Sequence, residues 1–234
     1  MKKEFLENGY VIYKNKLPLE YITIVQEITL DVRKKILSEN LKGKSKLYGG
    51  MQHWDGLEMA SMEHERLFDL YTSDLMYDIA KELLDTEEIY LFNDQIVTKL
   101  PNDGFKFNPH TDNELGPNKK LASEGFYRSI TCCWVLDDFT ENNGPIVLMN
   151  KKTNEYETIY PKTGDIAVWD GETLHYSNEN VSDKPRRVWL QIYTTKDITN
   201  IPSIKNFKRY YGQSFIKGNT INELKNSNIK RSLL

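Results

Sequence analysis

Two places in the sequence have histidine and aspartate at the spacing of metal ligands. They are His53-Trp54-Asp55 and His110-Thr111-Asp112. In an extended chain, residues i and i+2 share a face, so His110 and Asp112 can present an imidazole and a carboxylate to one point. His175, from a later strand-like run, is the candidate third ligand. Two histidines and one carboxylate on one face of an octahedron leave three positions open, an arrangement that suits non-haem Fe(II).

Simpler interpretations of these histidines remain open. The residues around His110 are turn-like in themselves, and His175 alone could be a hydrogen-bonded histidine inside a barrel. The pair at His53 has no strand-like context, so we interpret it as a turn near the pocket, and His64 as a helix-surface residue. A closed zinc site is disfavoured, because it needs four protein ligands and no cysteine pair is spaced to supply them.

An arginine at the start of a strand-like run is the candidate partner for a carboxylate. In residues 186–194, alternation places Arg186 on one face with Val188, Leu190 and Ile192, and Arg187 on the other. The aliphatic face is the better candidate for a barrel interior. There a small dicarboxylate could chelate the metal at one end and pair with the guanidinium of Arg186 at the other. The alternative is that Arg186 lies at a surface strand end and Arg187 points inward.

The composition favours one soluble domain. The chain has 234 residues, 39% of them hydrophobic, with 31 basic and 34 acidic residues and a net charge of −3. This balance disfavours nucleic acid as a partner. No apolar run approaches the roughly 20 residues of a membrane span, so no membrane is expected. Cys132 and Cys133 are adjacent, which disfavours a disulfide between them. We expect both cysteines to be small residues of the barrel wall, and we expect the protein to be cytoplasmic.

The elements that would position these side chains are helices first and short strands afterwards. Apolar steps of three and four predict helices over residues 20–37 and 62–84, with Ser73 as a possible N-cap and a loop over residues 42–50. Residues 9–12 predict a short strand. From residue 89 onward, short runs between turn residues predict an antiparallel sandwich or barrel. These runs are residues 89–100, 126–136, 146–149, 157–160, 165–169, 173–176 and 186–194.

The predicted organisation is a single domain over residues 1–234, mainly β with N-terminal helices. Residues 1–88 form a mainly helical part that packs on the barrel, residues 89–197 a jelly-roll core, and residues 198–234 a tail. In the tail, Thr220 and Glu223 have the spacing of a capping box, so a small helical cap and a disordered end are both open. Ligands of such barrels usually lie in the mouth.

The order and spacing of several segments together are more specific than any one motif. The segments are Gly9–Ile12 ahead of a helix, Phe92–Pro101, His110–Asp112, Cys133–Gly144, Gly164–Gly171, His175–Ser177 and Asn180–Arg187. Taken together, they resemble the phytanoyl-CoA hydroxylase-like family of Fe(II)- and 2-oxoglutarate-dependent oxygenases, through most of the chain up to about residue 195.

This resemblance implies a double-stranded β-helix, which is a cupin-like jelly roll. It implies that iron binds His110, Asp112 and His175, and that 2-oxoglutarate, the co-substrate, pairs with Arg186. It also implies that Ser177 hydrogen-bonds the co-substrate carboxylate. Trp134 and Gln95 match family positions that line the same pocket.

The resemblance further implies a dioxygenase that uses O₂ to hydroxylate an unactivated C–H bond of a small-molecule substrate. The carboxylate of Asp112 disfavours halogenation, whereas desaturation, ring closure and epimerisation stay open. Residues 145–152 replace the Pro-Gly-Ser-His element of the family, and the segment between His110 and Trp134 is long, so substrate identity does not transfer. The alternatives are a non-catalytic jelly roll that binds a ligand or metal, and an oxygenase that acts on a peptide or protein residue.

Overall fold

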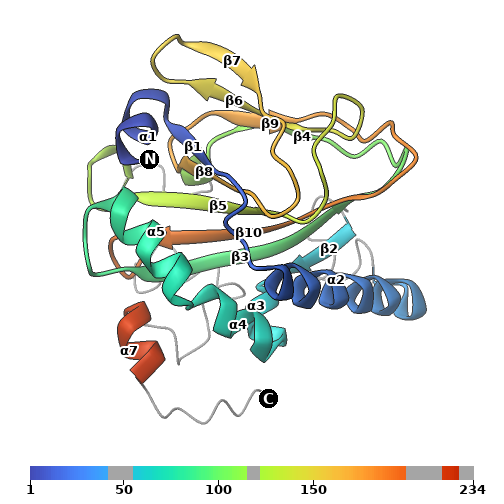
Figure 1. Ribbon diagram of the computed structural model, residues 1–234, viewed down its shortest axis with the longest axis horizontal. Helices are drawn as coiled ribbons and strands as arrows, with labels where there is room; N and C mark the ends of the chain where they lie inside the picture. The colour runs from blue at the N-terminus through green and yellow to red at the C-terminus, as the bar shows by residue number, and fades with distance from the viewer. Residues whose placement is uncertain (42–54, 115–121, 199–217, 227–234) are drawn as a thin grey trace.

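Two antiparallel sheets pack face to face in the computed structural model, which describes residues 1–41, 55–114, 122–198 and 218–226 (Figure 1). The larger sheet has the strand order β1-β8-β5-β10-β3-β2, and the smaller one has the order β4-β9-β6-β7. The strands are β1 (Tyr10–Tyr13), β2 (Asp55–Glu58), β3 (Tyr90–Lys99), β4 (Phe107–His110), β5 (Ser129–Val135), β6 (Ile146–Asn150), β7 (Glu155–Thr158), β8 (Ile166–Asp170), β9 (His175–Ser177) and β10 (Arg186–Thr194).

The path of the chain from β3 to β10 passes back and forth between the two sheets. Strands β3, β5, β8 and β10 lie in the larger sheet, and β4, β6, β7 and β9 lie in the smaller one. This winding makes a double-stranded β-helix, and the predicted mainly β jelly roll with N-terminal helices is confirmed. Strands β1 and β2, from the part of the chain predicted to be mainly helical, extend the larger sheet at its two edges.

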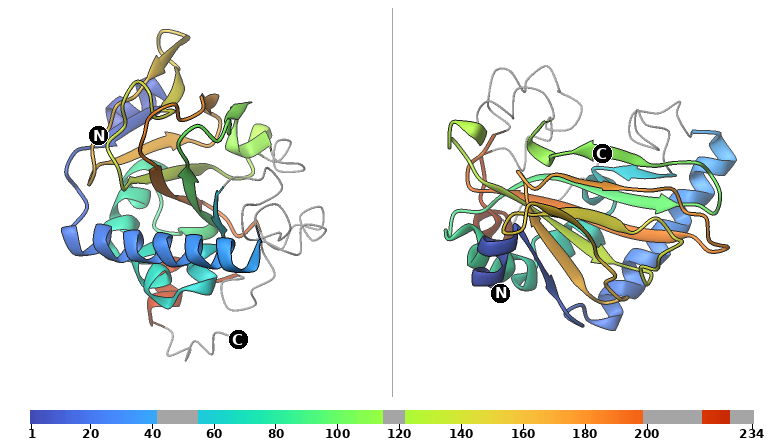
Figure 2. Two further views of the ribbon diagram at one scale, coloured as in Figure 1. Left: turned by 90° about the vertical axis from the view of Figure 1, so that its right-hand side faces the viewer. Right: turned by 90° about the horizontal axis from the view of Figure 1, so that it is seen from above.

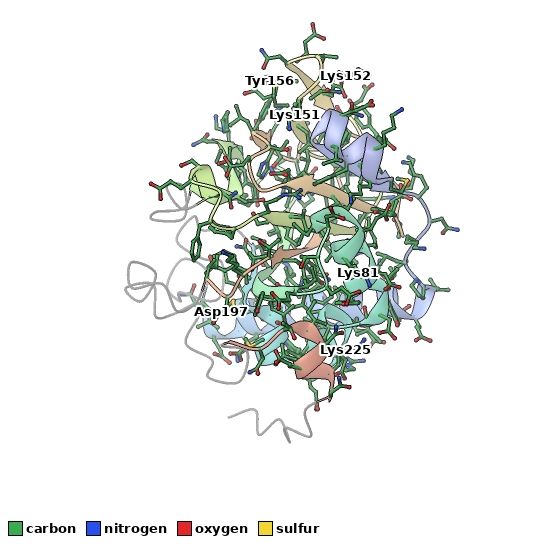
Figure 3. All side chains as sticks on the ribbon, turned by 90° about the vertical axis from the view of Figure 1, so that its left-hand side faces the viewer. Lys81, Lys151, Lys152, Tyr156, Asp197 and Lys225 are labelled. Atoms are coloured by element: carbon green, nitrogen blue, oxygen red, sulfur yellow. The ribbon has the colours of Figure 1, made fainter. Side chains whose placement is uncertain are left out.

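Helices cover the face of the larger sheet that is turned away from the smaller sheet (Figures 1 and 2). This layer contains α2 (Leu19–Glu39), α3 (Ala60–Glu63), α4 (Glu65–Tyr71), α5 (Asp74–Leu84) and α7 (Ile221–Asn226), while α1 (Lys2–Asn8) leads into β1. In Figure 3, Lys81 and Lys225 lie in the helical layer, whereas Lys151, Lys152 and Tyr156 lie at the far end of the β6–β7 hairpin. The metal-binding candidates lie between the two sheets.

Alternation along each central strand divides its side chains between two cores. In β5, Cys132 and Trp134 pack into the core between the larger sheet and the helices. Their neighbours Cys133 and Val135 pack into the second core, between the two sheets. Because strand neighbours point to opposite faces, this parity decides which residues can reach the site.

Most predicted elements are found, with differences at specific residues. The helix predicted over residues 20–37 is α2, whereas residues 62–84 form parts of three helices, since His64 and Ser73 adopt extended backbone angles between them. Helix α1 was not predicted, because it buries only Phe5 and ends at Gly9, whose φ is 82°. Strand β2 was also not predicted. The predicted loop over residues 42–50 and the pair His53-Trp54 lie outside the described residues.

The predicted capping box in the tail is present at the N-terminus of helix α7. The side chain of Glu223 accepts hydrogen bonds from the backbone N–H of Thr220, at 2.7 Å, and from its hydroxyl, at 2.9 Å. The backbone N–H of Glu223 in turn donates to Thr220 Oγ1 at 3.3 Å. Ile221 and Leu224 are buried against the first core. Within the described part of the chain, no helix combines the length and the apolar character needed to cross a membrane.

Candidate metal centre

The pair His110 and Asp112 meets His175, which lies more than sixty residues later in the sequence, between the two sheets. His110 is the last residue of β4, Asp112 is the first of the short 3₁₀ helix η1 (Asp112–Glu114), and His175 is the first of β9. Their potential ligand atoms all lie within 4.8 Å of one another. His110 and His175 are cross-strand partners, with ring centroids 4.3 Å apart. In the described residues, this is the single cluster with the composition of a metal site.

A β-bulge places His110 opposite His175. Phe107 pairs with Ser177 and His110 pairs with His175, so β4 uses one residue more than β9 over the same length. In a regular ladder Pro109 would face His175; the bulge absorbs one residue and brings His110 to that place. Strand β4 is an edge strand, where a proline is tolerated. The strand then ends, and Asp112 arrives through a 3₁₀ turn instead of the extended geometry predicted from the i, i+2 spacing.

Both histidines are oriented by their own backbone. Nδ1 of His110 lies 2.7 Å from the carbonyl oxygen of Asn108, and Nδ1 of His175 lies 2.9 Å from that of Thr173. A carbonyl can only accept, so each Nδ1 carries the proton and each Nε2 keeps its lone pair for a metal. Burial lowers the pKa of His175, which favours the neutral form that a metal ligand requires.

Asp112 is held through one of its two carboxylate oxygens. Oδ2 accepts a hydrogen bond from Nε1 of Trp169 at 2.9 Å and another from the hydroxyl of Thr131. Oδ1 lies 3.7 Å from Nε2 of His175. One oxygen is therefore engaged by the protein, while the other faces the histidines.

The residue after Asp112 anchors the turn to three other segments. The side-chain oxygen of Asn113 accepts from Ser129 Oγ at 2.9 Å and from the Tyr127 hydroxyl at 3.2 Å, while its Nδ2 donates to Glu172 at 2.5 Å. Its backbone N–H donates to the carbonyl of Gly171 at 3.2 Å. A Cβ at Gly171 would lie 2.0 Å from Ser129 Oγ, so this close approach requires glycine.

The two consecutive arginines differ in what they bind. Arg187 donates to both carboxylate oxygens of Asp137, at 2.8 Å from Nε and 2.7 Å from Nη2. Arg186 is 2% exposed, and its Nε and Nη1 have no hydrogen-bond partner in the described residues. Its guanidinium carbon lies 4.6 Å from the centre of the Phe139 ring. Burial lowers the pKa of Arg186 to about 10. Arg187 thus already has its carboxylate, whereas Arg186 is a buried cation that is hydrogen-bonded to no carboxylate through Nε or Nη1 in the described residues.

Lys99 is a second buried cation, and it was missed in the sequence. It is the cross-strand partner of Arg186 and is fully buried. Its ammonium donates to the carbonyl oxygens of Phe105, at 3.3 Å, of Ser177, at 3.2 Å, and of Asn178. Burial and the charge of Arg186 lower the pKa of Lys99 to about 7. The signal was a lysine near the end of the strand-like run of residues 89–100.

The other predicted pocket residues are divided between the two cores. Ser177 is buried in β9 opposite Phe107, and Gln95 pairs with Leu190, which packs against the core between the sheets. Trp134 does not line this interior, and that prediction is corrected. Its Nε1 lies 3.1 Å from Met76 Sδ, and its ring stacks on Tyr21 among the helices.

His64, predicted to lie on a helix surface, is the N-cap residue of α4 and is half-buried. Arg128 donates to the carbonyl oxygens of Leu83 and Leu84, and its guanidinium lies 4.0 Å from the carboxylate of Asp170.

An open cavity of about 470 Å³ runs along β4 and the segment before it, and Gly104–His110 line it. His110 therefore belongs both to the metal cluster and to the wall of this cavity. A molecule in the cavity would lie next to the metal ligands.

Comparisons with known proteins agree with this architecture. Solved structures of similar fold include EctD from S. alaskensis with 2-oxoglutarate and 5-hydroxyectoine, with a TM-score of 0.68, 16% identity, and coverage of 82% of this chain and 74% of that one. The epimerase SnoN in complex with Fe³⁺, alpha ketoglutarate and nogalamycin RO has a TM-score of 0.66, 14% identity, and coverage of 84% and 82%. The non-heme alpha ketoglutarate dependent carbocyclase SnoK from nogalamycin biosynthesis has a TM-score of 0.67, 16% identity, and coverage of 83% of both chains.

At such low identity these likenesses concern the fold alone. No curated protein matches the sequence. A family model does match it, over residues 5–188, and that model describes phytanoyl-CoA dioxygenase (PhyH). Since this match covers most of the 234 residues, the chain belongs to the phytanoyl-CoA dioxygenase family.

Proposed function

We propose that this protein is an Fe(II)- and 2-oxoglutarate-dependent dioxygenase that hydroxylates an unactivated C–H bond of a small molecule. The observation that carries the proposal is one interior that holds both a His-Asp-His cluster and Arg186, a buried arginine whose Nε and Nη1 have no partner in the described part of the chain. Membership of the family and the iron and 2-oxoglutarate in structures of the same fold support it.

The donor atoms of the cluster fit iron. His110 and His175 offer neutral Nε2 atoms, and Asp112 offers Oδ1, so a metal would have three protein ligands on one side. Three open positions remain, which is what a bidentate co-substrate and O₂ require together. Zinc in a structural site would instead take a fourth protein ligand, and none lies beside the three in the described residues.

The surroundings of Arg186 fit a dicarboxylate. A buried guanidinium with unsatisfied N–H groups is costly unless an anion joins it. Lys99 on the neighbouring strand adds a second positive charge, and Ser177 on β9 adds a hydroxyl. In the proposed site 2-oxoglutarate would bind the metal through its oxoacid end, and Arg186 would hold its distal carboxylate.

When bound, iron and 2-oxoglutarate supply the activation of O₂ and the oxidation of the C–H bond. The residues of the chain orient and shield the reaction. His110, Asp112 and His175 would hold the metal, and Arg186 would orient the co-substrate. Val188 and Leu190 lie on the same face of β10 as Arg186, and their apolar side chains would exclude water from the space between the metal and Arg186. Substrate would approach through the cavity along β4.

An anaerobic titration of metal-free protein with Fe(II) and 2-oxoglutarate tests the proposal, through the weak visible absorption of an iron-chelated oxoacid. The wild type should develop this band, and His175→Ala should abolish it. Arg186→Met should raise the Kd for 2-oxoglutarate about 30-fold or more, since losing one partner of a buried charge pair costs about 2 kcal/mol or more. Arg187→Lys, next in the chain, is the matched control and should bind like the wild type.

Two results would contradict the proposal. If folded wild-type protein gives no band, a non-catalytic ligand-binding jelly roll becomes the better account. If Arg187→Lys loses 2-oxoglutarate and Arg186→Met does not, the co-substrate anchor is assigned to the wrong arginine. Once binding is established, release of succinate in a screen of small molecules and of peptides identifies the substrate class.

A further inference from the structure

We propose that Thr131 and Trp169 are positioning residues that keep Asp112 bound to the metal through Oδ1 alone. The proposal rests on the metal site of the proposed function and deepens it. Both residues donate a hydrogen bond to Oδ2, the oxygen of Asp112 that is not nearest His175. Neither residue was singled out in the sequence.

The two donors are fixed in place by the larger sheet. Thr131 in β5 and Trp169 in β8 are direct cross-strand partners, so their side chains leave the same face of the sheet side by side. Each residue is 1% exposed. Asp112 is the single hydrogen-bond partner of both side chains in the described residues. A tryptophan Nε1–H can only donate, so at this position it requires an acceptor such as a carboxylate oxygen.

The geometry of Asp112 leaves one oxygen for the metal. Oδ1 lies 3.7 Å from Nε2 of His175, which is within the ~4.2 Å that two metal bonds of about 2.1 Å can span. Turning the carboxylate so that both oxygens face a metal would break the two hydrogen bonds to Oδ2. Binding through one oxygen would leave the third position open, which the co-substrate and O₂ need together.

A purely structural role is the competing account. In that account the carboxylate of Asp112 serves to satisfy two buried donors, and the metal site would form equally well without them. The two accounts differ in what happens to metal binding when a donor group is removed and the protein still folds. Partners that orient a metal ligand typically change metal affinity 10–100-fold when they are lost.

Co(II) bound to the metal-free full chain is the probe, because its visible absorption reports coordination number and its binding needs no turnover. Thr131→Val and Trp169→Phe should each raise the Kd for Co(II) by about 10–100-fold and alter the absorption bands. Thr131→Ser keeps the hydroxyl and should restore wild-type affinity and bands. A positioning role predicts this pattern, whereas a structural role predicts wild-type Kd and bands in every folded variant.

Two control variants remove the same chemical groups elsewhere. The hydroxyl of Thr194 donates to the carbonyl of Lys196 at 2.8 Å, and Nε1 of Trp134 lies 3.1 Å from Met76 Sδ on the helical side. Thr194→Val and Trp134→Phe should bind Co(II) like the wild type. If they weaken binding as much as the test variants do, the positioning role is overturned.

The outcomes separate this inference from the proposed function. If wild-type protein fails to bind Co(II), or binds it as well after His175→Ala, the metal site itself is wrong. If the wild type binds through His175 and folded Thr131→Val has the same Kd and bands, only the positioning role fails. Should Trp169→Phe not fold, the pair Thr131→Val and Thr131→Ser decides the question alone.

Discussion

At the scale of single residues, the distinguishing feature of the pocket is a pair of buried, positively charged side chains on neighbouring strands. Arg186 and Lys99 are cross-strand partners, both are buried, and burial lowers the pKa of each. Like charges this close destabilise a fold unless an anion lies between or beside them. Backbone carbonyl oxygens accept hydrogen bonds from the ammonium of Lys99, whereas Nε and Nη1 of Arg186 have no hydrogen-bond partner in the described residues. Binding of a dicarboxylate would therefore relieve a cost already built into the pocket.

A buried carboxyl on the opposite face of β3 leads to a prediction about pH. Asp94 accepts hydrogen bonds from the backbone N–H and hydroxyl of Ser61 and from Nε1 of Trp189, yet burial raises its pKa to about 6. The folded chain thus keeps a proton that the unfolded chain has already lost. The retained proton stabilises the folded state fully at a pH below the pKa that Asp94 has in the unfolded chain. This stabilisation is lost as the pH rises through about 6, the pKa of Asp94 in the folded chain. The lost contribution is about 3 kcal/mol, at ~1.4 kcal/mol per pKa unit.

Asp94→Asn should remove this pH dependence. The amide oxygen can accept from Trp189 and the N–H of Ser61, and the amide nitrogen can donate to the Ser61 hydroxyl. Urea unfolding at pH 4.5 and pH 7 should show the variant gaining stability relative to the wild type as the pH rises. Asp78→Asn, at an exposed position of α5, is the control and should follow the wild type. A constant difference between variant and wild type would contradict the assignment.

At the scale of elements, the turn between β8 and β9 controls where Asp112 lies. Gly171 in this turn accepts a hydrogen bond from the backbone of Asn113 and lies against Ser129. Gly171→Ala would place a Cβ 2.0 Å from Ser129 Oγ and 2.8 Å from Asn113 Nδ2. Ser129 would have to rotate away from Asn113, and η1 would shift with its aspartate.

We therefore expect Gly171→Ala to raise the Kd for Fe(II) about tenfold or more, as measured by competition with a metal-binding dye. Gly125→Ala is the control, because a Cβ there meets nothing within 4 Å, although φ is 72°. It should lose some stability through backbone strain and keep its metal affinity. Equal affinities in both variants would show that η1 does not depend on this turn.

Strand patterns in the sequence predicted some elements well and could not predict others. Strand β10 has the predicted bounds, because aliphatic residues alternate with other types along its whole length. Strand β5 was found, and alternation along it puts Ser129 and Thr131 on the face of Cys133, opposite to Trp134. Trp134 was placed in the pocket because it matches a family position, although this alternation pointed to the other face.

The ligand candidates could be predicted because the order and spacing of several segments mark them together, whereas their supports could not. The His-x-Asp spacing alone also occurs at His53, so it does not single out His110 and Asp112. Thr131, Trp169 and Asn113 act through contacts made only when β5, β8 and η1 come together. The bulge at Pro109 depends likewise on pairing with β9, which no local pattern of β4 encodes.

At the scale of the whole molecule, a metal ion would join the two sheets. His110 and His175 belong to the smaller sheet, and Asp112 is hydrogen-bonded to the larger one through Thr131 and Trp169. A metal at 100 times its Kd should stabilise the fold by about 2.7 kcal/mol, because it binds the folded chain alone. For a chain of this size we expect thermal unfolding to shift by roughly 5–10 °C.

Differential scanning calorimetry with and without Mn(II), under anaerobic conditions, checks this expectation. His175→Ala should show no metal-dependent shift in Tm. A shift in the variant equal to that of the wild type would mean that the stabilising ion binds elsewhere.

Strand β4, which carries His110, is a four-residue edge strand with a proline in its bulge. Such a segment is held by few hydrogen bonds, so it should be among the first parts of the fold to open, and opened segments are where proteases cut. Metal bound to His110 would hold this strand closed. A cell short of iron would then lose the protein itself to degradation, so its abundance, and not only its activity, would follow the supply of the metal.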